Sequence, residues 1–209
     1  MDILEQIGII PVDYAVLRSL FSDYNFPQNK IANLEQDGKL IRLKRGMYVI
    51  SPSVSKQLLS TELIANHIYG PSYISMESAL RYYGFIPEQV HIVRSMTIGR
   101  SKKFENAIAN FEYITVNNDY YSIGIRQQTV DNKYTFLIAS PEKALCDIIT
   151  STPHLRLQSE KALKIYLEED LRLDMSALET MSSEIINQCM EFGKKKEILK
   201  LLLKFLHYE

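Results

Sequence analysis

A short N-terminal stretch concentrates positive charge on side chains that can bind phosphate. Residues 37–50, DGKLIRLKRGMYVI, alternate like a β-hairpin and contain no acid after Asp37. The cations of this stretch are Lys39, Arg42, Lys44 and Arg45. Such side chains pair with nucleic-acid phosphates and release the counterions condensed on them. The stretch therefore predicts a phosphate-contacting surface, although a charged face on a small hairpin can also simply be solvated.

The segment before this stretch carries side chains suited to reading bases. In residues 27–37, PQNKIANLEQD, Ile31 and Leu34 share one apolar face of a predicted helix. The positions that a core does not need are Gln28, Asn29, Lys30, Asn33 and Gln36. Amides can make bidentate contacts with adenine, and a lysine can hold phosphate. The segment predicts a DNA-reading helix, although amides on helices are common.

A second basic cluster lies in residues 94–104, RSMTIGRSKKF, where no acid occurs before Glu105. Its cations are Arg94, Arg100, Lys102 and Lys103. The cluster could extend a DNA footprint or contact RNA, and it could equally be a solvated loop. The sequence leaves these alternatives open.

Enzymatic chemistry has weaker support in the sequence. A nuclease site of carboxylates and a lysine could be assembled from Glu77, Glu112, Asp119 and Lys133. Such residues normally decorate exposed faces. The histidines are scattered without metal-ligand spacing at His67, His91, His154 and His207. No glycine-rich phosphate loop or nucleophile elbow occurs, so we expect no catalytic residues, no metal and no cofactor.

Aromatic and sulfur side chains are interpreted mainly as packing groups. Four tyrosines that could stack on bases are Tyr69, Tyr73, Tyr82 and Tyr83. Such residues are more often half-buried, with satisfied hydroxyls. Cys146 and Cys189 both lie in apolar, helix-like surroundings, which predicts small buried hydrophobes rather than a disulfide.

The elements that must position the N-terminal cations and amides follow from local patterns. Residues 13–22 predict a helix capped by Asp13, with an apolar stripe of Val16, Leu17, Leu20 and Phe21. The turn DYNF leads to the helix at 27–37, which Gly38 is placed to end. This order of helix, turn, helix and cationic hairpin is the winged-helix arrangement. Its second helix enters the major groove, and its wing lies along phosphates or the adjacent minor groove.

The rest of the chain mixes helices and strands. Residues 60–70 and 73–85 predict helices, the second capped by Ser75 and ended by Gly84. Strands are predicted between Val90 and Ala139 at HIVRSMTI, FEYITV, YYSIGIRQQTV and YTFLIA. SPEKALCDIIT begins a helix with Ser140 as N-cap and Pro141 at the first helical position. Helices are predicted at 159–169, 176–181, 183–192 and in a lysine-studded last segment.

Two domains are predicted from these elements. The polar, turn-rich segment at residues 51–57 reads as a linker between residues 1–56 and residues 58–209. It has little apolar content to pack across a boundary, so each half should have its own core. The predicted fold class is α+β, an N-terminal winged helix-turn-helix followed by a mixed α/β domain with a helical C-terminal tail.

Composition sets further bounds. The chain has 209 residues, 46% hydrophobic and 23% charged, with a formal net charge of −1, which is typical of a globular protein. No global basicity argues for nucleic acid, so that case rests on local clusters. The first ten residues carry acids and no basic region of the secretory-signal type, and EILKLLLKFLHYE is too short and too charged to span a bilayer. We expect a cytoplasmic protein without membrane contact.

Three segments resemble one known family. LEQDGKLIRLKRGMYVI, IYGPSYISMESALRYYGFIPEQV and ASPEKALCDII, in this order and spacing, are similar to the AbiEi family of antitoxins, regulators in type IV toxin–antitoxin (abortive infection) operons. The similarity runs from about residue 12 to residue 150, with a looser helical tail. The region before the first clear helix is shorter than a winged-helix first helix would be.

The resemblance implies a function for each half. Residues 1–56 would bind the repeats of a double-stranded DNA operator and repress the protein's own operon. Residues 58–209 would counteract a nucleotidyltransferase-like toxin without forming a stable complex with it. The basic cluster at residues 94–103 could then contact the substrate of that toxin. The alternatives are a solitary winged-helix regulator and, with less support, a nuclease.

Overall fold

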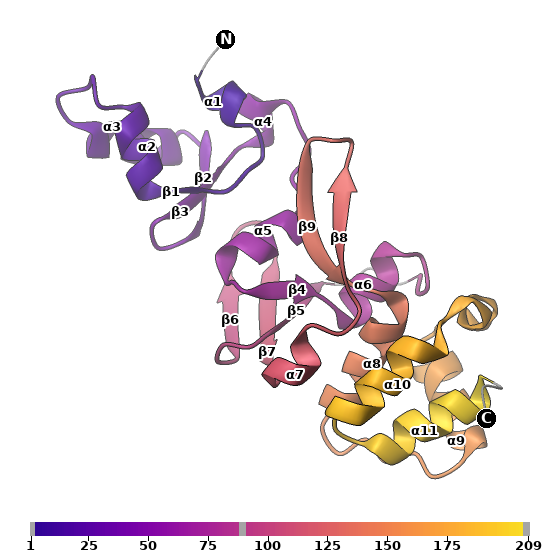
Figure 1. Ribbon diagram of the computed structural model, residues 1–209. Helices are drawn as coiled ribbons and strands as arrows, with labels where there is room; N and C mark the ends of the chain where they lie inside the picture. The colour runs from indigo at the N-terminus through magenta and orange to yellow at the C-terminus, as the bar shows by residue number, and fades with distance from the viewer. Residues whose placement is uncertain (1–2, 88–90, 207–209) are drawn as a thin grey trace.

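The computed structural model describes residues 3–87 and 91–206, and Figure 1 shows a small N-terminal unit beside a larger unit of mixed helices and strands. Within the described residues the fold is α+β, with one three-stranded and one six-stranded sheet. Two hydrophobic clusters form its interior. Residues 88–90, which end the segment IYGPSYISMESALRYYGFIPEQV, lie outside the described part of the chain, as does His207.

The N-terminal unit has the predicted order of elements plus an additional short helix and strand. Its elements are α1 (Ile3–Ile7), β1 (Val12–Asp13), α2 (Tyr14–Leu20), α3 (Pro27–Gln36), β2 (Leu40–Lys44) and β3 (Met47–Ile50). The sheet is antiparallel, in the order β1-β3-β2. Gly38, with φ +67°, follows α3 and permits the sharp turn into β2.

Helix α2 differs from its prediction. Asp13 pairs with Met47 in the sheet, and its side chain makes no capping hydrogen bond. Leu17 and Phe21 of the predicted stripe are buried, whereas Val16 is 46% exposed. The helix therefore buries a narrower stripe than the sequence predicts, because α3 and the hairpin cover only one side of it.

Two cores meet at the hairpin. The small core comprises Leu4, Leu17, Phe21, Ile31, Leu34, Leu40, Tyr48 and Ile50. The large core fills the second unit, and it also includes Leu43, Met47 and Val49 of the hairpin. Successive strand residues point to opposite faces, so all four residues of β3 are buried, alternately in one core and in the other.

The segment predicted as a linker is partly helical. Residues Pro52–Ser55 form α4, and the Ser51 hydroxyl accepts a hydrogen bond from the backbone N–H of Ser53. The apolar contact between the two halves is made by the hairpin rather than by this segment. Division of the chain at residues 56–58 into independently folding domains stays a prediction.

The second unit is built on a mixed six-stranded sheet. Its strands are β4 (Ser72–Ile74), β5 (Ile92–Thr97), β6 (Lys102–Glu105), β7 (Asn110–Thr115), β8 (Ile125–Val130) and β9 (Tyr134–Ala139). They lie in the order β6-β7-β5-β4-β9-β8, with β5 parallel to β7 and β4 parallel to β9. Asp131 and Asn132 both have positive φ and form the predicted turn between β8 and β9.

Three local predictions differ from the structure, at β4, at α7 and at Ser75. Strand β4 occupies the start of a segment that predicts a helix, and β6 forms in the basic segment for which a solvated loop is one of the open alternatives. Helix α7 (Asn118–Tyr121) occupies part of a predicted strand, because the Asn117 side chain accepts a hydrogen bond from the Tyr120 N–H at 2.7 Å and caps a helical turn. Ser75 precedes α6 (Met76–Tyr82) but makes no cap, since its hydroxyl donates to Asp147 at 2.6 Å.

Helices cover both faces of the sheet. Helix α5 (Thr61–Ile68) lies on one face, where the Tyr113 hydroxyl donates to the Ala65 carbonyl at 2.6 Å. Helices α6 and α8 (Pro141–Ser151) lie on the other face, to which Arg94 and Tyr73 point. The remaining elements are α9 (Glu160–Ile165), a π-helical turn (Tyr166–Asp170), a 3₁₀ helix (Met175–Thr180), α10 (Ser183–Phe192) and α11 (Lys196–Phe205).

The starts of α5 and α8 are confirmed as predicted. The Ser60 hydroxyl accepts from the Leu63 N–H, and the Ser140 hydroxyl accepts from the Lys143 N–H. The predicted helix at 159–169 is divided between α9 and the π-helical turn. Within the described ranges, none of the helices combines the length and the apolar character needed to cross a bilayer.

Candidate nucleic-acid interface

Helix α3 presents most of the predicted base-reading residues to solvent. Gln28, Asn29, Asn33 and Gln36 are exposed, while Ile31 and Leu34 are buried in the small core. Lys30 is half-buried, with its ammonium 5.2 Å from the centre of the Tyr24 ring. The helix therefore exposes four amide side chains, and its one cation is anchored on Tyr24.

The hairpin cations divide into exposed and engaged groups. Arg45 is exposed at the turn, and Lys39 is exposed with its ammonium 3.9 Å from the Asp37 carboxylate. The Arg42 guanidinium donates to Glu35 on α3 at 2.7 Å and lies over the Tyr48 ring. The hydrogen bond to Glu35 is the main cause that raises the pKa of Arg42. Arg42 thus has an internal carboxylate that a phosphate would have to displace.

Lys44 has a different environment. Its ammonium donates to the Ile68 carbonyl at the end of α5, at 2.7 Å, and the Asn106 amide donates to the Leu43 carbonyl at 3.1 Å. A register shift between Arg42 and Lys44 lies at this point of the hairpin. Lys44 therefore joins the hairpin to the second unit and is only half-exposed.

One further cation beside α3 was not singled out from the sequence. Arg18 on α2 is exposed, and it lines a groove of about 510 Å³ with Ser19, Ser22 and Pro27. In the sequence Arg18 belongs to the polar face of an ordinary amphipathic helix. Only the packing of α2 on α3 places it next to the start of α3.

The second basic cluster is split by the sheet. Arg94 donates to Glu77 at 2.6 Å and to Glu112 at 3.2 Å, and Lys103 pairs with Glu112 at 2.8 Å. The hydrogen bond from Lys103 is the largest cause that lowers the pKa of Glu112, ahead of the effect of Arg94. Two of the four cations are therefore paired with carboxylates from elsewhere in the chain.

The other two cations lie apart from this ion network. Lys102 alternates with Lys103 along β6 and places its ammonium 4.7 Å from the centre of the Tyr69 ring, on the face that α5 covers. Arg100 is exposed in the turn before β6. The cluster thus does not form one continuous basic surface.

The residues weighed as a nuclease site are only partly brought together. Glu77 and Glu112 approach the same guanidinium of Arg94, whereas Asp119 lies on α7 and Lys133 lies in the β8–β9 turn. Across residues 3–87 and 91–206, no group of three or more histidine, cysteine or acidic side chains could hold a metal ion. Arg94 therefore occupies the position between the two carboxylates.

The tyrosines of residues 69–83 mostly pack. Tyr73 is buried, and its hydroxyl donates to Asp147 at 3.1 Å. Tyr69 packs edge-on against Tyr113, and Tyr82 packs edge-on against Phe136. The pKa of Tyr73 is raised far above the ordinary tyrosine value. Burial is the largest cause, and the charge of Asp147 is the next largest.

The segment ASPEKALCDII carries a buried polar cluster. On α8, the Lys143 ammonium lies 3.3 Å from Asp147, and both side chains are fully buried. Asp147 also accepts hydrogen bonds from Tyr73 and Ser75, and Lys143 donates to the Tyr120 carbonyl at 2.9 Å. Desolvation is the main cause that raises the pKa of Asp147. The cluster is sealed from solvent and joins α8 to β4 and α7.

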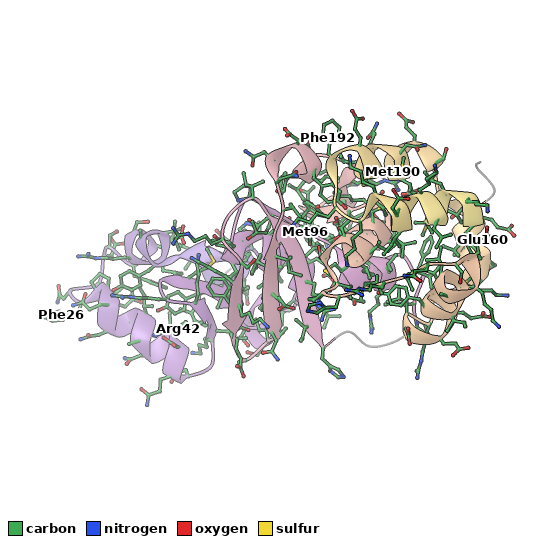
Figure 2. The ribbon with its side chains drawn as sticks, turned by 90° about the horizontal axis from the view of Figure 1, so that it is seen from below. Phe26, Arg42, Met96, Glu160, Met190 and Phe192 are labelled. Atoms are coloured by element: carbon green, nitrogen blue, oxygen red, sulfur yellow. The ribbon has the colours of Figure 1, made fainter. Side chains whose placement is uncertain are left out.

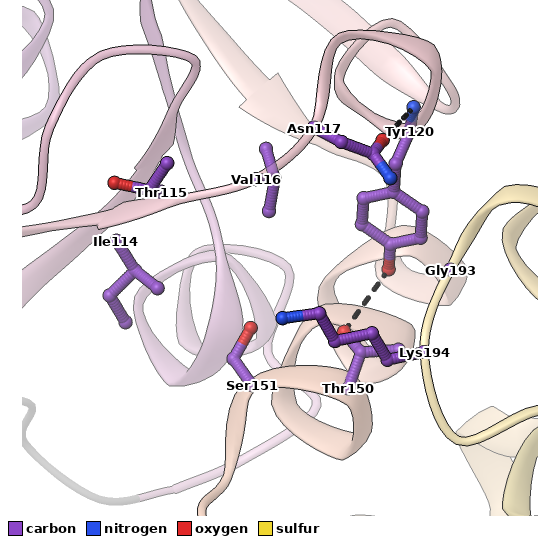
Figure 3. A pocket seen from close by; sticks show the side chains of 9 residues that line it. All are labelled: Ile114, Thr115, Val116, Asn117, Tyr120, Thr150, Ser151, Gly193 and Lys194. Carbon is purple, nitrogen blue, oxygen red and sulfur yellow. Dashed lines mark hydrogen bonds between the residues drawn. The ribbon is translucent and has the colours of Figure 1, made fainter.

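A pocket of about 430 Å³ lies where β7 ends beside the end of α8 and the α10–α11 turn (Figure 3). Figure 3 shows the Lys194 side chain reaching across it toward Ser151, and the Tyr120 hydroxyl lies 3.4 Å from Thr150. The described residues that line it include no carboxylate, histidine or cysteine. Burial raises the pKa of Tyr120 well above its ordinary value. None of the carboxylates considered for a nuclease site lines this pocket.

Comparison with known proteins adds no identification. No protein-family model matches the chain, and no curated protein sequence matches it either.

Proposed function

We propose that the chain is a DNA-binding transcriptional regulator whose N-terminal unit is a winged helix. The order α1-β1-α2-α3-β2-β3, with β1 and β2 on either side of β3, is the feature that supports this proposal best. In this arrangement α3 enters the major groove with its exposed amides, and Lys39 and Arg45 face the flanking phosphates. The role requires no catalysis.

The regulator is proposed to be the antitoxin of a type IV system. This part of the proposal rests on the resemblance of three segments to the AbiEi family. Those segments include the end of α3 and the hairpin, the last residue of α5 with β4 and α6, and most of α8. The second unit would oppose a nucleotidyltransferase-like toxin without binding it stably. A solitary regulator is the alternative if no such toxin exists.

DNA binding is tested by selecting bound duplexes from a random pool with the full-length chain. Asn29→Ala and Asn33→Ala should each weaken binding to the selected site by roughly 1–3 kcal/mol, the range for a lost bidentate contact. Binding to unrelated DNA should barely change. Gln127→Ala, an exposed amide on β8, serves as the matched control. If the variants lose the same affinity for both DNAs, the two asparagines contact the DNA backbone and not the bases. If the full-length chain selects no sequence from the pool, the proposal of a sequence-specific regulator is refuted.

The antitoxin role is tested in cells that express the product of a neighbouring nucleotidyltransferase gene. The full-length chain should restore growth, and it should do so without co-purifying with the toxin. The double variant Asn29→Ala/Asn33→Ala should still restore growth when both genes are under foreign promoters. Absence of such a gene beside this one, or no rescue by the folded protein, would favour the solitary regulator.

A further inference from the structure

Phe26 is an aromatic side chain that the rest of the described chain leaves uncovered. It is 63% exposed, a larger fraction than for Tyr24, Tyr82 or Phe192. Figure 2 shows it at the end of the molecule opposite to Glu160. Within residues 3–87 and 91–206, no aromatic ring or cation packs against it in the way that Lys30 packs on Tyr24. A partner that covered this ring would gain the free energy of burying its apolar surface.

The attachment point of the ring is fixed to α3. Phe26 directly precedes the helix, and its carbonyl accepts hydrogen bonds from the N–H groups of Asn29 at 3.0 Å and Lys30 at 3.3 Å. Tyr24, two residues earlier, packs edge-on against Phe21 of the small core. The backbone on both sides of Phe26 is therefore held, and only its side chain projects.

The neighbours of Phe26 match what an A·T base pair presents in the major groove. Such a pair exposes the N6 and N7 atoms of adenine beside the O4 atom and the C5 methyl of thymine. Asn29 supplies an amide for the adenine, Lys30 supplies a cation for a nearby phosphate, and Phe26 supplies an apolar ring for the methyl. No carboxylate occurs from Tyr24 to Leu34 to repel the DNA backbone.

We infer that Phe26 is a specificity-determining residue that contacts the C5 methyl of a thymine, in or next to the base pair read by Asn29. The N-terminal residues of the second helix are those that reach base edges in helix-turn-helix docking. The inference rests on the proposed DNA binding and deepens it, because it names the chemical group that the exposed apolar side chain just before α3 recognises.

The test removes that methyl group one thymine at a time. The full-length chain first selects its site from random DNA, and each thymine of the site is then replaced by deoxyuridine, which pairs identically but lacks the methyl. The wild-type chain should lose about fourfold in affinity at one thymine, the contribution of one buried methyl group. Phe26→Ala should show no loss at that thymine and unchanged losses elsewhere. Phe26→Leu, which stays apolar, should keep part of the discrimination.

Two controls separate this inference from the function on which it rests. Leu58→Ala removes another exposed apolar side chain, 89% exposed and outside α3, and should reproduce the wild-type scan. Identical scans for wild type and Phe26→Ala, with site selection intact, would overturn the role of Phe26 and leave DNA binding standing. Self-association of the wild type that Phe26→Ala abolishes, with an unchanged scan, would assign the ring to a contact between copies. Failure of the wild type to select any site would overturn both proposals.

Discussion

At the scale of single residues, the positively charged side chains of one hairpin have different roles. Arg45 is exposed, Arg42 is held by Glu35, and the ammonium of Lys44 is bonded to a backbone carbonyl of the second unit. A cation that already has a partner must give it up before it can hold phosphate. Phosphate binding by this hairpin is therefore expected mainly from Arg45, and from Lys39, whose ion pair with Asp37 is long at 3.9 Å and exposed to solvent.

Arg45→Ala and Lys44→Ala should consequently have different effects on DNA binding and on stability. Arg45→Ala should weaken binding to selected and random DNA alike and reduce the slope of log K against log salt by about 0.9, as for one lost phosphate contact. Lys44→Ala should change that slope little and lower the free energy of unfolding by roughly 1–3 kcal/mol, since it removes a charged hydrogen bond. Salt titrations and urea unfolding of both variants measure the contrast. Equal salt slopes for the two variants would contradict it.

Glu35 is predicted to weaken DNA binding by neutralising Arg42. Glu35→Gln removes the competing carboxylate, so affinity for any DNA should rise and the salt slope should steepen by about 0.9. Glu179→Gln makes the same change in net charge at an exposed site on the 3₁₀ helix and controls for long-range effects. If the two variants bind alike, Arg42 does not contact phosphate.

At the scale of elements, α8 is positioned by charges that the core excludes from water. Its first two turns carry Glu142, Lys143 and Asp147, all buried. Glu142 accepts a hydrogen bond from the Ser182 N–H at 3.0 Å, which ties α8 to the start of α10. Buried charges of this kind are tolerated only when they are paired and hydrogen-bonded.

Removing one partner of the buried Lys143–Asp147 pair should lower the free energy of unfolding more than replacing both partners. Asp147→Asn keeps the shape but leaves the Lys143 ammonium without its countercharge, and it should lower the free energy of unfolding by about 3–5 kcal/mol. Adding Lys143→Met should recover much of that loss, because no isolated charge then remains. Urea unfolding of the two single variants and the double variant gives the coupling free energy between the two side chains. Additive losses would show that the pair is not a unit.

The ion network across β5, β6 and β7 predicts a pH dependence. The pKa of Glu112 is lowered from its reference value of 4.5, so its charged form stabilises the fold above about pH 4.5. That stabilisation should be lost as the pH falls through the lowered pKa. Glu112→Gln should be less stable at neutral pH and should lose less stability on acidification. Parallel curves of stability against pH for the two proteins would exclude this contribution.

At the scale of the whole molecule, the hairpin connects the two units through their cores. Tyr48 and Ile50 belong to the small core, while Met47 and Val49 of the same strand belong to the large core. A fragment ending near residue 56 would expose the second pair. The geometry of α3 relative to the second unit is thereby held by apolar packing as well as by Lys44.

Shared packing predicts cooperative unfolding. Val49→Ala should lower stability by roughly 2 kcal/mol, the transfer and cavity cost of the lost carbons. Hydrogen exchange should show reduced protection of backbone amides in α3 and in α5 alike. Val16→Ala, the same change at a 46% exposed position, should cost less than about 0.5 kcal/mol. Loss of protection confined to one unit would instead support two independently folding domains.

The sequence by itself determined the features that depend on neighbouring residues. Pro27 and Gly38 bound α3, Ser140 and Pro141 start α8, and Asp131–Asn132 form a turn, because caps and turns are made within a few residues of chain. The alternation of the hairpin and the helical spacing of its neighbours likewise predicted the order of the N-terminal elements.

Only the tertiary structure decided which candidate residues are available. Lys44 binds a carbonyl 24 residues away, Arg94 binds carboxylates 17 and 18 residues away, and Ser75 binds Asp147 across 72 residues. Local pattern cannot specify such partners, because they come together only when separate elements pack. For the same reason the sequence gives no sign that both faces of β3 are covered or that Phe26 is left uncovered.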